Sequence, residues 1–160
     1  HGNLSVPENS AAFLELARNV LSRTRIPVKV AGKDPPEVFL RQTARYPNVT
    51  VIANPPDTQM DSLIQNAHIN LLFTAQPTGI KLKLLHALYA GRHCVVNRPM
   101  IEGTALENLC HPVDTAEQTL AILHKLMGIS FSESRIRERT IALADYSNRV
   151  SADKIIRLLS

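Results

Sequence analysis

A short stretch of the sequence combines cationic and imidazole side chains with glycines, in a pattern suited to binding phosphate. From Gln76 to Asn97 the pattern predicts a loop, a helix that opens at Gly79, and a buried strand. At spacings of 4, 3 and 4, one stripe of this helix contains Gly79, Lys83, His86 and Ala90. A helix N-terminus offers unpaired N–H groups and the positive end of a dipole, which together suit an anion. Lys81 and Lys83 would add full positive charges.

The rest of this helix has the pattern of a core element. Its wide apolar face consists of Leu82, Leu84, Leu85, Leu88 and Tyr89. Thr78 is expected to cap the N-terminus, Gly91 to end the helix with a positive φ, and residues 94–96 to form the strand. A solvated lysine and a histidine at the edge of the core would also explain the stripe, and for a single amphipathic helix that is the commoner case. Only the neighbouring segments can distinguish a phosphate site from such a solvated helix face.

Composition and charge narrow the class of partner. The chain has 160 residues, enough for one domain with a sizeable core. A net charge of +4 favours an anionic partner, which could be a phosphorylated small molecule, nucleic acid or an anionic membrane surface. Aromatic residues make up only 4% and Trp is absent, which argues against a platform that stacks nucleic-acid bases. We therefore expect no nucleic-acid partner.

Cysteine and histidine usage gives no sign of a metal or disulfide framework. Cys94 and Cys110 have no paired metal-ligand spacing, and no histidine lies four residues from a second histidine or a cysteine. We expect the isolated histidines at the surface or at strand ends: His68, His93, His111 and His124. No apolar run approaches the length of a membrane span and no signal peptide is evident, so a reducing, cytoplasmic compartment is expected.

The remaining segments predict an α/β fold. Strand-like runs at 28–31, 49–53, 69–73, 94–96 and 109–113 alternate with helices near 10–21, 35–46, 57–67, 79–90 and 115–127. Asn9 or Ser10 would cap the first helix, and 99–103 would be a loop. We predict a doubly wound, Rossmann-like parallel sheet of five to six strands flanked by helices, with extra C-terminal helices at 132–143 and 151–159. A polar face of the first of these contains Arg135, Arg137 and Arg139, and we expect it in solvent rather than on a membrane.

Ligands of such a sheet bind beyond the carboxyl ends of its strands. Gly2, Gly32, Asn54 and residues 76–79 all follow predicted strands and would meet there. The opening residues, His1 to Ser5, look like the end of a strand that enters a loop, and we expect the natural protein to have a preceding part. The chain itself, residues 1–160, is expected to be a single domain.

The segment from Thr78 to Val96 resembles the signature of a known family: the carboxyl-terminal, donor-binding half of GT-B-fold glycosyltransferases of the retaining, group-1 type. That signature reads roughly E-G-x-x-x-x-x-x-E-A-x-A-x-G-x-P-V-V. Matching positions are occupied by Gly79, Lys83, Ala87, Ala90, Gly91, Val95 and Val96. The opening His-Gly-Asn-Leu resembles the family's first glycine loop, and residues 30–32 its second strand and glycine. The resemblance covers nearly the whole chain, and the segments follow in the same order.

The resemblance implies a site for a nucleotide-diphosphate sugar. It places the donor at Gly2, Asn3, Gly32, Thr78, Gly79, Ile80, Lys81, Lys83 and His86. Thr78 and His86 stand where the family has two glutamates that bind the sugar and the ribose, so hydroxyl and imidazole replace carboxylates. The usual Arg and Lys of the first loops have no equivalent between Asn3 and Asn9, so Lys81 or Lys83 would neutralise the phosphates and act as the catalytic residues. Neither a metal nor another cofactor is implied.

The expected function is thus the donor-binding half of a hexosyltransferase-type enzyme of polysaccharide biosynthesis, which transfers sugar to a carbohydrate or lipid-linked acceptor. Its partner would be an N-terminal acceptor domain of the same protein, without which this chain would be inactive. The enzyme would be cytoplasmic, or peripheral to the inner face of an anionic membrane. Two alternatives stay open: a catalytically lapsed domain that binds a nucleotide or a protein, and another doubly wound enzyme such as a nucleotide-sugar epimerase. A dehydrogenase is disfavoured because no G-x-G-x-x-G occurs.

Overall fold

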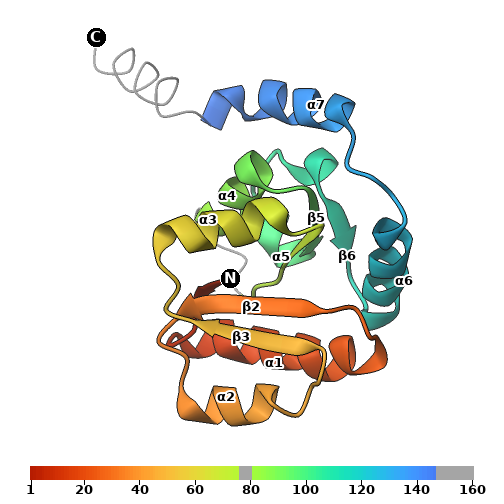
Figure 1. The fold of residues 1–160 in the computed structure, drawn as a ribbon. Helices are drawn as coiled ribbons and strands as arrows, with labels where there is room; N and C mark the ends of the chain where they lie inside the picture. Colours follow the sequence, from red (N-terminus) through yellow and green to blue (C-terminus); the bar gives the residue numbers. More distant parts are fainter. Residues whose placement is uncertain (76–80, 147–160) are drawn as a thin grey trace. The chain divides into compact units, whose positions relative to one another are not determined.

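A computed structural model of the protein describes residues 1–75 and 81–146 (Figure 1). The chain divides into two compact units, His1–Ser130 and Phe131–Ser160. The first unit has the predicted α/β architecture, in which every strand pairing is parallel. Its strands nevertheless form two three-stranded sheets instead of the one continuous sheet that the sequence predicts.

The first sheet has the order β1-β2-β3. Its strands and the helices between them are β1 (Gly2–Asn3), α1 (Pro7–Asn19), β2 (Val28–Lys33), α2 (Glu37–Thr43) and β3 (Val49–Ala53), with a 3₁₀ turn at Leu21–Arg23. β2 pairs with β3 over five residues, whereas β1 pairs with β2 only through Gly2 and Asn3. The break between the two sheets follows from this short β1, which reaches no strand of the second sheet.

The second sheet has the order β4-β5-β6. Its strands and helices are α3 (Asp57–Asn66), β4 (Ile69–Leu72), α4 (Leu82–Ala90), β5 (His93–Asn97), α5 (Arg98–Ile101), β6 (His111–Val113) and α6 (Ala116–Met127), with a 3₁₀ turn at Glu107–Leu109. The central strand, β5, is buried on both faces from His93 to Val96. This burial explains why a strand of apolar residues without polar alternation occurs here.

An apolar core joins the two sheets within the first unit. Its buried members come from α1 and the turn after it, from β5 and β6, and from α6: Leu16, Ala17, Val20, Leu21, Val95, Val113, Leu123 and Leu126. Val28 and Val49 of the first sheet and Leu71 of the second pack against this cluster. A smaller cluster of Leu4, Val30 and Phe39 lies under α2. The shared core therefore holds the sheets together where no strand pairing does.

Several local predictions need correction. The first helix begins at Pro7, and the predicted caps Asn9 and Ser10 lie inside it. Their side chains instead donate to the carbonyls of Asn3 and Leu4, so they fasten the β1–α1 turn. The predicted loop at 99–103 contains the short helix α5. By contrast, α6 agrees with its prediction because Thr115 and Gln118 form a capping box.

The second unit contains α7 (Glu133–Leu143), with Ser132 as its N-cap, and a 3₁₀ turn at Ala144–Tyr146. Arg135 and Arg137 are exposed as predicted, but Arg139 is buried, and its guanidinium lies 4.5 Å from the centre of the Phe131 ring. The predicted helix at 151–159 lies outside the described residues. Among the helices that the structure describes, none is long and apolar enough to span a membrane.

Gly91 is required for a reason that differs from the prediction. Its φ of −93° and ψ of −172° are extended, so no positive φ ends α4. A Cβ at this position would lie 2.3 Å from Nδ2 of Asn70 and 2.7 Å from the carbonyl oxygen of Ala87. The end of α4 thus packs so tightly on β4 that only a hydrogen fits.

We predict that Gly91→Ala lowers the free energy of unfolding by about 1–3 kcal/mol, the usual cost of overpacking. Gly128→Ala is the matched control, since its Cβ would meet nothing closer than the Lys125 carbonyl at 3.8 Å. Urea denaturation of both variants measures the difference. Equal midpoints for the two variants would contradict the packing that we describe.

Candidate functional site

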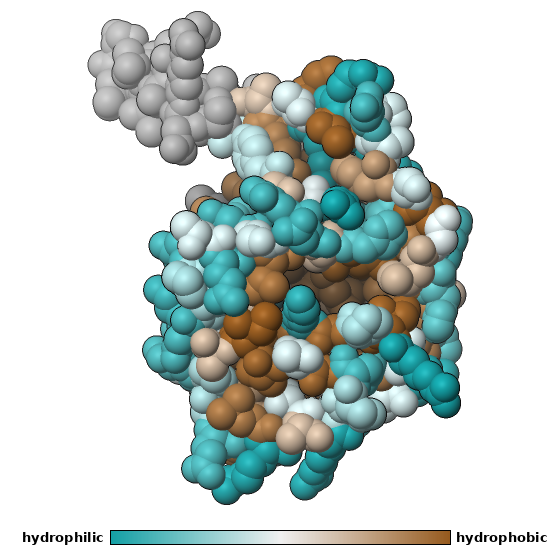
Figure 2. All heavy atoms as spheres, in the orientation of Figure 1, coloured by the Kyte–Doolittle hydropathy of each residue, from teal (hydrophilic) through white to brown (hydrophobic). Residues whose placement is uncertain are grey.

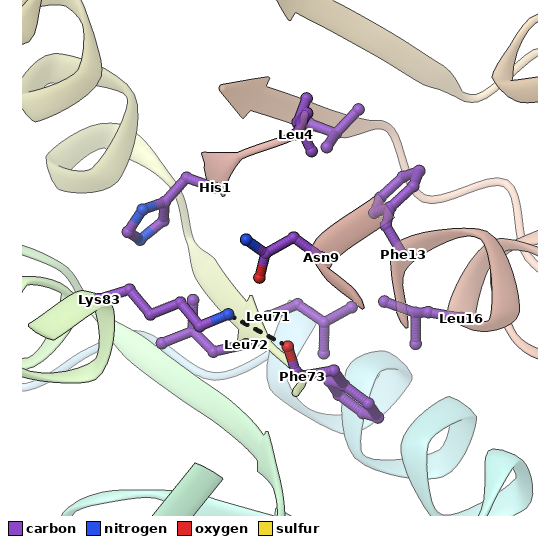
Figure 3. A pocket seen from close by; sticks show the side chains of 10 residues that line it. His1, Leu4, Asn9, Phe13, Leu16, Leu71, Leu72, Phe73 and Lys83 are labelled. Atoms are coloured by element: carbon purple, nitrogen blue, oxygen red, sulfur yellow. Dashed lines mark hydrogen bonds between the residues drawn. The ribbon is translucent and has the colours of Figure 1, made fainter. Parts of the chain in front are cut away.

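The candidate site lies where the carboxyl ends of β1 and β4 meet the first turn of α4. A pocket at this place has a polar end and an apolar end (Figure 3). The polar side chains come from the residue before β1, from α1 and from α4: His1, Asn9 and Lys83. The structure therefore brings Lys83 of the predicted stripe next to the β1–α1 turn, although the two are about eighty residues apart in sequence.

The start of α4 differs from the prediction. The helix begins at Leu82 with Lys81 as N-cap, not at Gly79 with Thr78 as N-cap. The φ of −90° and ψ of 71° at Lys81 are not helical, so the helix does not continue back through this residue. The Lys81 carbonyl accepts from the N–H groups of Leu84 and Leu85 at 2.8 and 3.2 Å. Thr78, Gly79 and Ile80 lie outside the described residues, and their predicted contacts stay predictions.

Both predicted catalytic lysines are at least partly buried. The Lys83 side chain is half-buried, and its Nζ donates to the Phe73 carbonyl at 3.4 Å, just beyond the end of β4 (Figure 3). Burial, and secondly the charge of Lys81, lower the pKa of Lys83 below its ordinary value. Lys81 itself is 9% exposed. An anion bound near Lys83 would stabilise the charged form of this lysine and would raise its pKa again.

His86, on the same face of α4, is paired with a carboxylate that the sequence did not indicate. Its Nε2 lies 3.0 Å from Oδ1 of Asp61 on α3, and both side chains are about half exposed. The ring of His1 meets the His86 ring edge-on, with 6.1 Å between the centroids. No spacing signal links Asp61 to His86, because the contact depends on how α3 packs beside α4. A carboxylate is thus present next to the position at which the sequence lacks the expected glutamate.

Backbone packing explains in part why the other predicted donor-binding positions have the residues that they have. Gly2 and Gly32 face each other across the β1–β2 pairing, and a Cβ on Gly32 would lie 2.1 Å from the Gly2 carbonyl oxygen. Gly2 has a φ of +148°, which favours glycine. Asn3 Oδ1 accepts from the backbone N–H and hydroxyl of Ser5 at 3.0 and 2.8 Å, so this side chain shapes the turn. A ligand role for these three residues stays a prediction.

Three histidines gather at the opposite, amino ends of the second sheet. The His93 ring meets the His68 ring edge-on and lies tilted against the His111 ring, with centroid distances of 5.3 and 5.5 Å. The prediction of surface or strand-end positions is confirmed for this group, and His93, the first residue of β5, is buried, with only 1% of its surface exposed. Its Nε2–H donates to the Ile129 carbonyl at 3.1 Å, and His68 Nε2 donates to that of Leu126 at 2.7 Å. These bonds give the cluster a structural role at the end of α6.

Within the described ranges, no group of three or more histidine, cysteine, aspartate or glutamate side chains could hold a metal ion. The candidate site therefore offers cations, an imidazole–carboxylate pair and amides rather than a metal-ligand set. Such groups can bind phosphate and hydroxyl groups.

Among solved structures, the chain is similar to an α,α-trehalose-phosphate synthase (UDP-forming) from Burkholderia xenovorans, solved in complex with glucose-6-phosphate. The TM-score is 0.69 at 15% identity, and the match covers 99% of this chain and 42% of that one. No protein-family model and no curated protein matches the sequence. At this identity the likeness shows the fold alone, which is a Rossmann-like, GT-B-type half-domain. The chain spans less than half the length of that structure.

The geometry at His1 predicts a pH dependence of stability. Burial, and secondly the nearby charge of Lys83, lower the pKa of the α-ammonium from 8.0 to about 6. The unfolded chain then holds this proton more tightly, so the free energy of unfolding should rise between about pH 6 and pH 8, by at most about 2.7 kcal/mol. Urea denaturation across this range measures the rise. In a chain with an acetylated α-amino group this contribution disappears, so identical pH profiles for the two chains would contradict the prediction.

Proposed function

We propose that this chain is the donor-binding half of a glycosyltransferase that uses a nucleotide-diphosphate sugar. The observation that carries the proposal is the pair of partly buried lysines at the start of α4, at the carboxyl ends of parallel strands. Crevices at this edge of α/β sheets are where such folds bind ligands. The fold likeness to a UDP-forming synthase supports the same class of donor.

The role of the lysines is to stabilise the leaving group. In the transfer, the bond between the anomeric carbon and the diphosphate oxygen breaks, and the carbon bonds to an acceptor oxygen. The nucleoside diphosphate keeps the electron pair, so negative charge grows on its oxygens. Lys81 and Lys83 would meet that charge, together with the positive end of the α4 dipole. A preorganised donor of this kind contributes roughly 2.7–4 kcal/mol to the transition state.

Asp61 and His86 would recognise a hydroxyl group of the sugar or the ribose. When Nε2–H of the imidazole donates to Asp61, the other ring nitrogen, Nδ1, can accept from a hydroxyl. Asp61 has a second carboxylate oxygen that can accept as well. The pair would thereby replace the glutamate that the resembled family has at the position of His86.

The whole enzyme would need an acceptor-binding domain in addition to this chain, in line with the 42% of the structural neighbour that the chain covers. We therefore propose that the chain binds donor but does not turn it over alone. The acceptor would be a carbohydrate or a lipid-linked sugar, and the net charge of +4 is compatible with a place at an anionic membrane surface. The alternative, a lapsed domain that binds a nucleotide or a protein, is favoured by Thr78 and His86 in place of two glutamates.

A panel of nucleoside diphosphates in a thermal-unfolding assay tests the proposal. At a ligand concentration 100 times Kd, binding adds about 2.7 kcal/mol, which should raise Tm by about 5–10 °C for a chain of this size. Lys83→Ala should weaken the binding about tenfold or more, because a charge-assisted hydrogen bond is lost. Arg92→Ala is the matched control and should leave Kd unchanged, because Arg92 is an exposed cation that follows the carboxyl end of α4, away from its first turn.

The outcomes separate the alternatives. Unchanged melting curves for every diphosphate would favour the lapsed domain that binds a protein. Equal losses for Lys83→Ala and Arg92→Ala would mean that the first turn of α4 is not where the ligand binds. Turnover of a nucleotide sugar by this chain alone would point to an epimerase-like enzyme instead.

We further predict that Asp61→Asn weakens binding of the nucleotide sugar roughly threefold to tenfold more than binding of the matching diphosphate, since one hydrogen bond to a hydroxyl is lost. Isothermal titration with both ligands measures the ratio. Glu37→Gln is the control, because Glu37 is an exposed carboxylate that is likewise paired with a side chain four residues or more away, Arg41 of α2. Equal effects of Asp61→Asn on the two ligands would place Asp61 away from the sugar and the ribose.

A further inference from the structure

The two cysteines of the chain lie opposite each other on neighbouring strands of the second sheet. β5 and β6 pair in parallel, with Val95 opposite His111. One residue earlier, the same register puts Cys94 of β5 opposite Cys110, which comes directly before β6. The φ of −119° and ψ of 174° at Cys110 are extended, so this residue continues the line of the strand. Both cysteines are thiols in the structure.

The two cysteine side chains project from the same face of the sheet. Successive residues of a strand point to opposite faces. Val95 of β5 and Val113 of β6 share a buried cluster with Leu123, so these two valines point toward α6. Cys94 is one residue from Val95, and Cys110 is three residues from Val113. Both odd offsets put the thiols on the face that points away from α6.

This arrangement satisfies the main geometric requirement for a disulfide bond. Neighbouring strands lie about 4.8 Å apart, and the Cα atoms of two bonded cysteines lie about 4.4–6.8 Å apart. The Cβ atoms need to approach to about 3.5–4.5 Å. Cys110 can make this shift together with the preceding turn, because its N–H donates to the Glu107 carbonyl at 3.0 Å and the pairing with β5 begins only at His111.

The simpler alternative is that both cysteines merely fill apolar space. Cysteine is often buried as a small hydrophobic residue. In the space-filling view, hydrophobic residues gather in a hollow in the middle of the face shown, and polar residues surround it (Figure 2). An apolar interior of this kind explains Cys94, which is 0% exposed. It does not explain why a second, partly exposed cysteine stands directly opposite, on a strand at the edge of the sheet.

We propose that Cys94 and Cys110 form a redox site, which a peroxide converts to a disulfide bond. Cys110 reacts first, because it is the partly exposed member of the pair. Its thiolate sulfur attacks one peroxide oxygen, so an S–O bond forms while the O–O bond breaks. The other oxygen takes up a proton and leaves as water, or as an alcohol where the peroxide is organic. Cys110 is then a sulfenic acid.

Cys94 completes the reaction. Its sulfur attacks the sulfenic sulfur of Cys110, the S–S bond forms, and the S–O bond breaks. The released oxygen takes up protons and leaves as water. Over both steps the two thiols lose two electrons and two protons, and the peroxide gains them. The inference concerns the second sheet and does not depend on the proposed donor.

The disulfide would close residues 94–110 into a covalent loop that contains α5 and the 3₁₀ turn. Arg98 already connects parts of this region, since Nη1 lies 3.2 Å from Oε1 of Glu107 and Nε lies 3.1 Å from Oδ1 of Asp114. These ion pairs are exposed, and such pairs contribute little to stability. A covalent bond at the base of the loop would restrict the unfolded chain much more. Oxidation should therefore stabilise the folded chain.

Treatment of the reduced 160-residue chain with hydrogen peroxide, followed by mass spectrometry, tests the proposal. The chain should lose the mass of two hydrogens and, after cleavage at glutamates, give two peptides joined by a disulfide. Glu102 and Glu107 lie between the cysteines, so this cleavage separates them. Trypsin would leave both cysteines in one peptide, because Pro99 follows Arg98. A disulfide between two copies of the chain would overturn the proposal.

Two single variants separate the roles of the cysteines. In Cys94→Ala the sulfenic acid of Cys110 has no thiol to attack it, so labelling by dimedone should increase about tenfold or more over the parent chain. In Cys110→Ala the buried Cys94 should be oxidised about tenfold more slowly than Cys110 is in the parent. Equal labelling of the parent and Cys94→Ala, or equally fast oxidation of the two cysteines, would overturn the proposal.

An equilibrium measurement needs no substitution. In glutathione buffers, the equilibrium constant for the disulfide should be about tenfold or more larger in the folded chain than in urea, because the strands hold the thiols together. By linkage, the oxidised chain should melt about 3 °C or more above the reduced chain. An equal or smaller constant in the folded chain would show that the register does not align the thiols and would overturn the inference.

Discussion

The packing of α1 and α6 against both parallel sheets is the interaction on which the rest of the structure depends. Leu16 and Ala17 of α1 share one buried cluster with Val95 of β5 and with Leu123 and Leu126 of α6. Since β1 does not reach β4, this cluster supplies the connection that a continuous hydrogen-bonded sheet would otherwise supply. It also fixes the carboxyl ends of β1 and β4 near each other, and so positions the side chains of the candidate site.

The apolar face and the polar stripe of α4 have a common origin in its periodicity. Leu84, Ala87 and Leu88 are fully buried and anchor the helix on the second sheet. Their burial turns Lys83 toward the pocket with His1, and His86 toward Asp61 on α3. Tight contact at Gly91 limits how the end of the helix can shift. The position of the cation is therefore set by apolar packing, in agreement with the general behaviour of sites that are held on rigid elements.

Local patterns predicted the elements better than their ends. β3 agrees with its predicted range of 49–53, and α6 begins where its capping box requires. The predicted start of α4 is wrong. The helix-breaking residues at 77–79 indicated an earlier boundary than the non-helical backbone at Lys81 allows. Tertiary contacts determine the extended conformation of Gly91 and the burial of His93, and the residues near them in sequence do not indicate either one. The pairing of Asp61 with His86 is of the same kind.

The division of the pocket into two ends connects the sheet with the proposed chemistry. Lys83 Nζ donates to the carbonyl of Phe73, at the place where β4 leaves the sheet. The strand that offers this carbonyl is held in place by the apolar core, because Leu71 of β4 packs against the cluster that contains Leu16. Burial next to the same core lowers the pKa of Lys83, so an anion at the polar end would stabilise the charged form of this lysine. Apolar packing and the charge of the candidate site are therefore linked through one side chain.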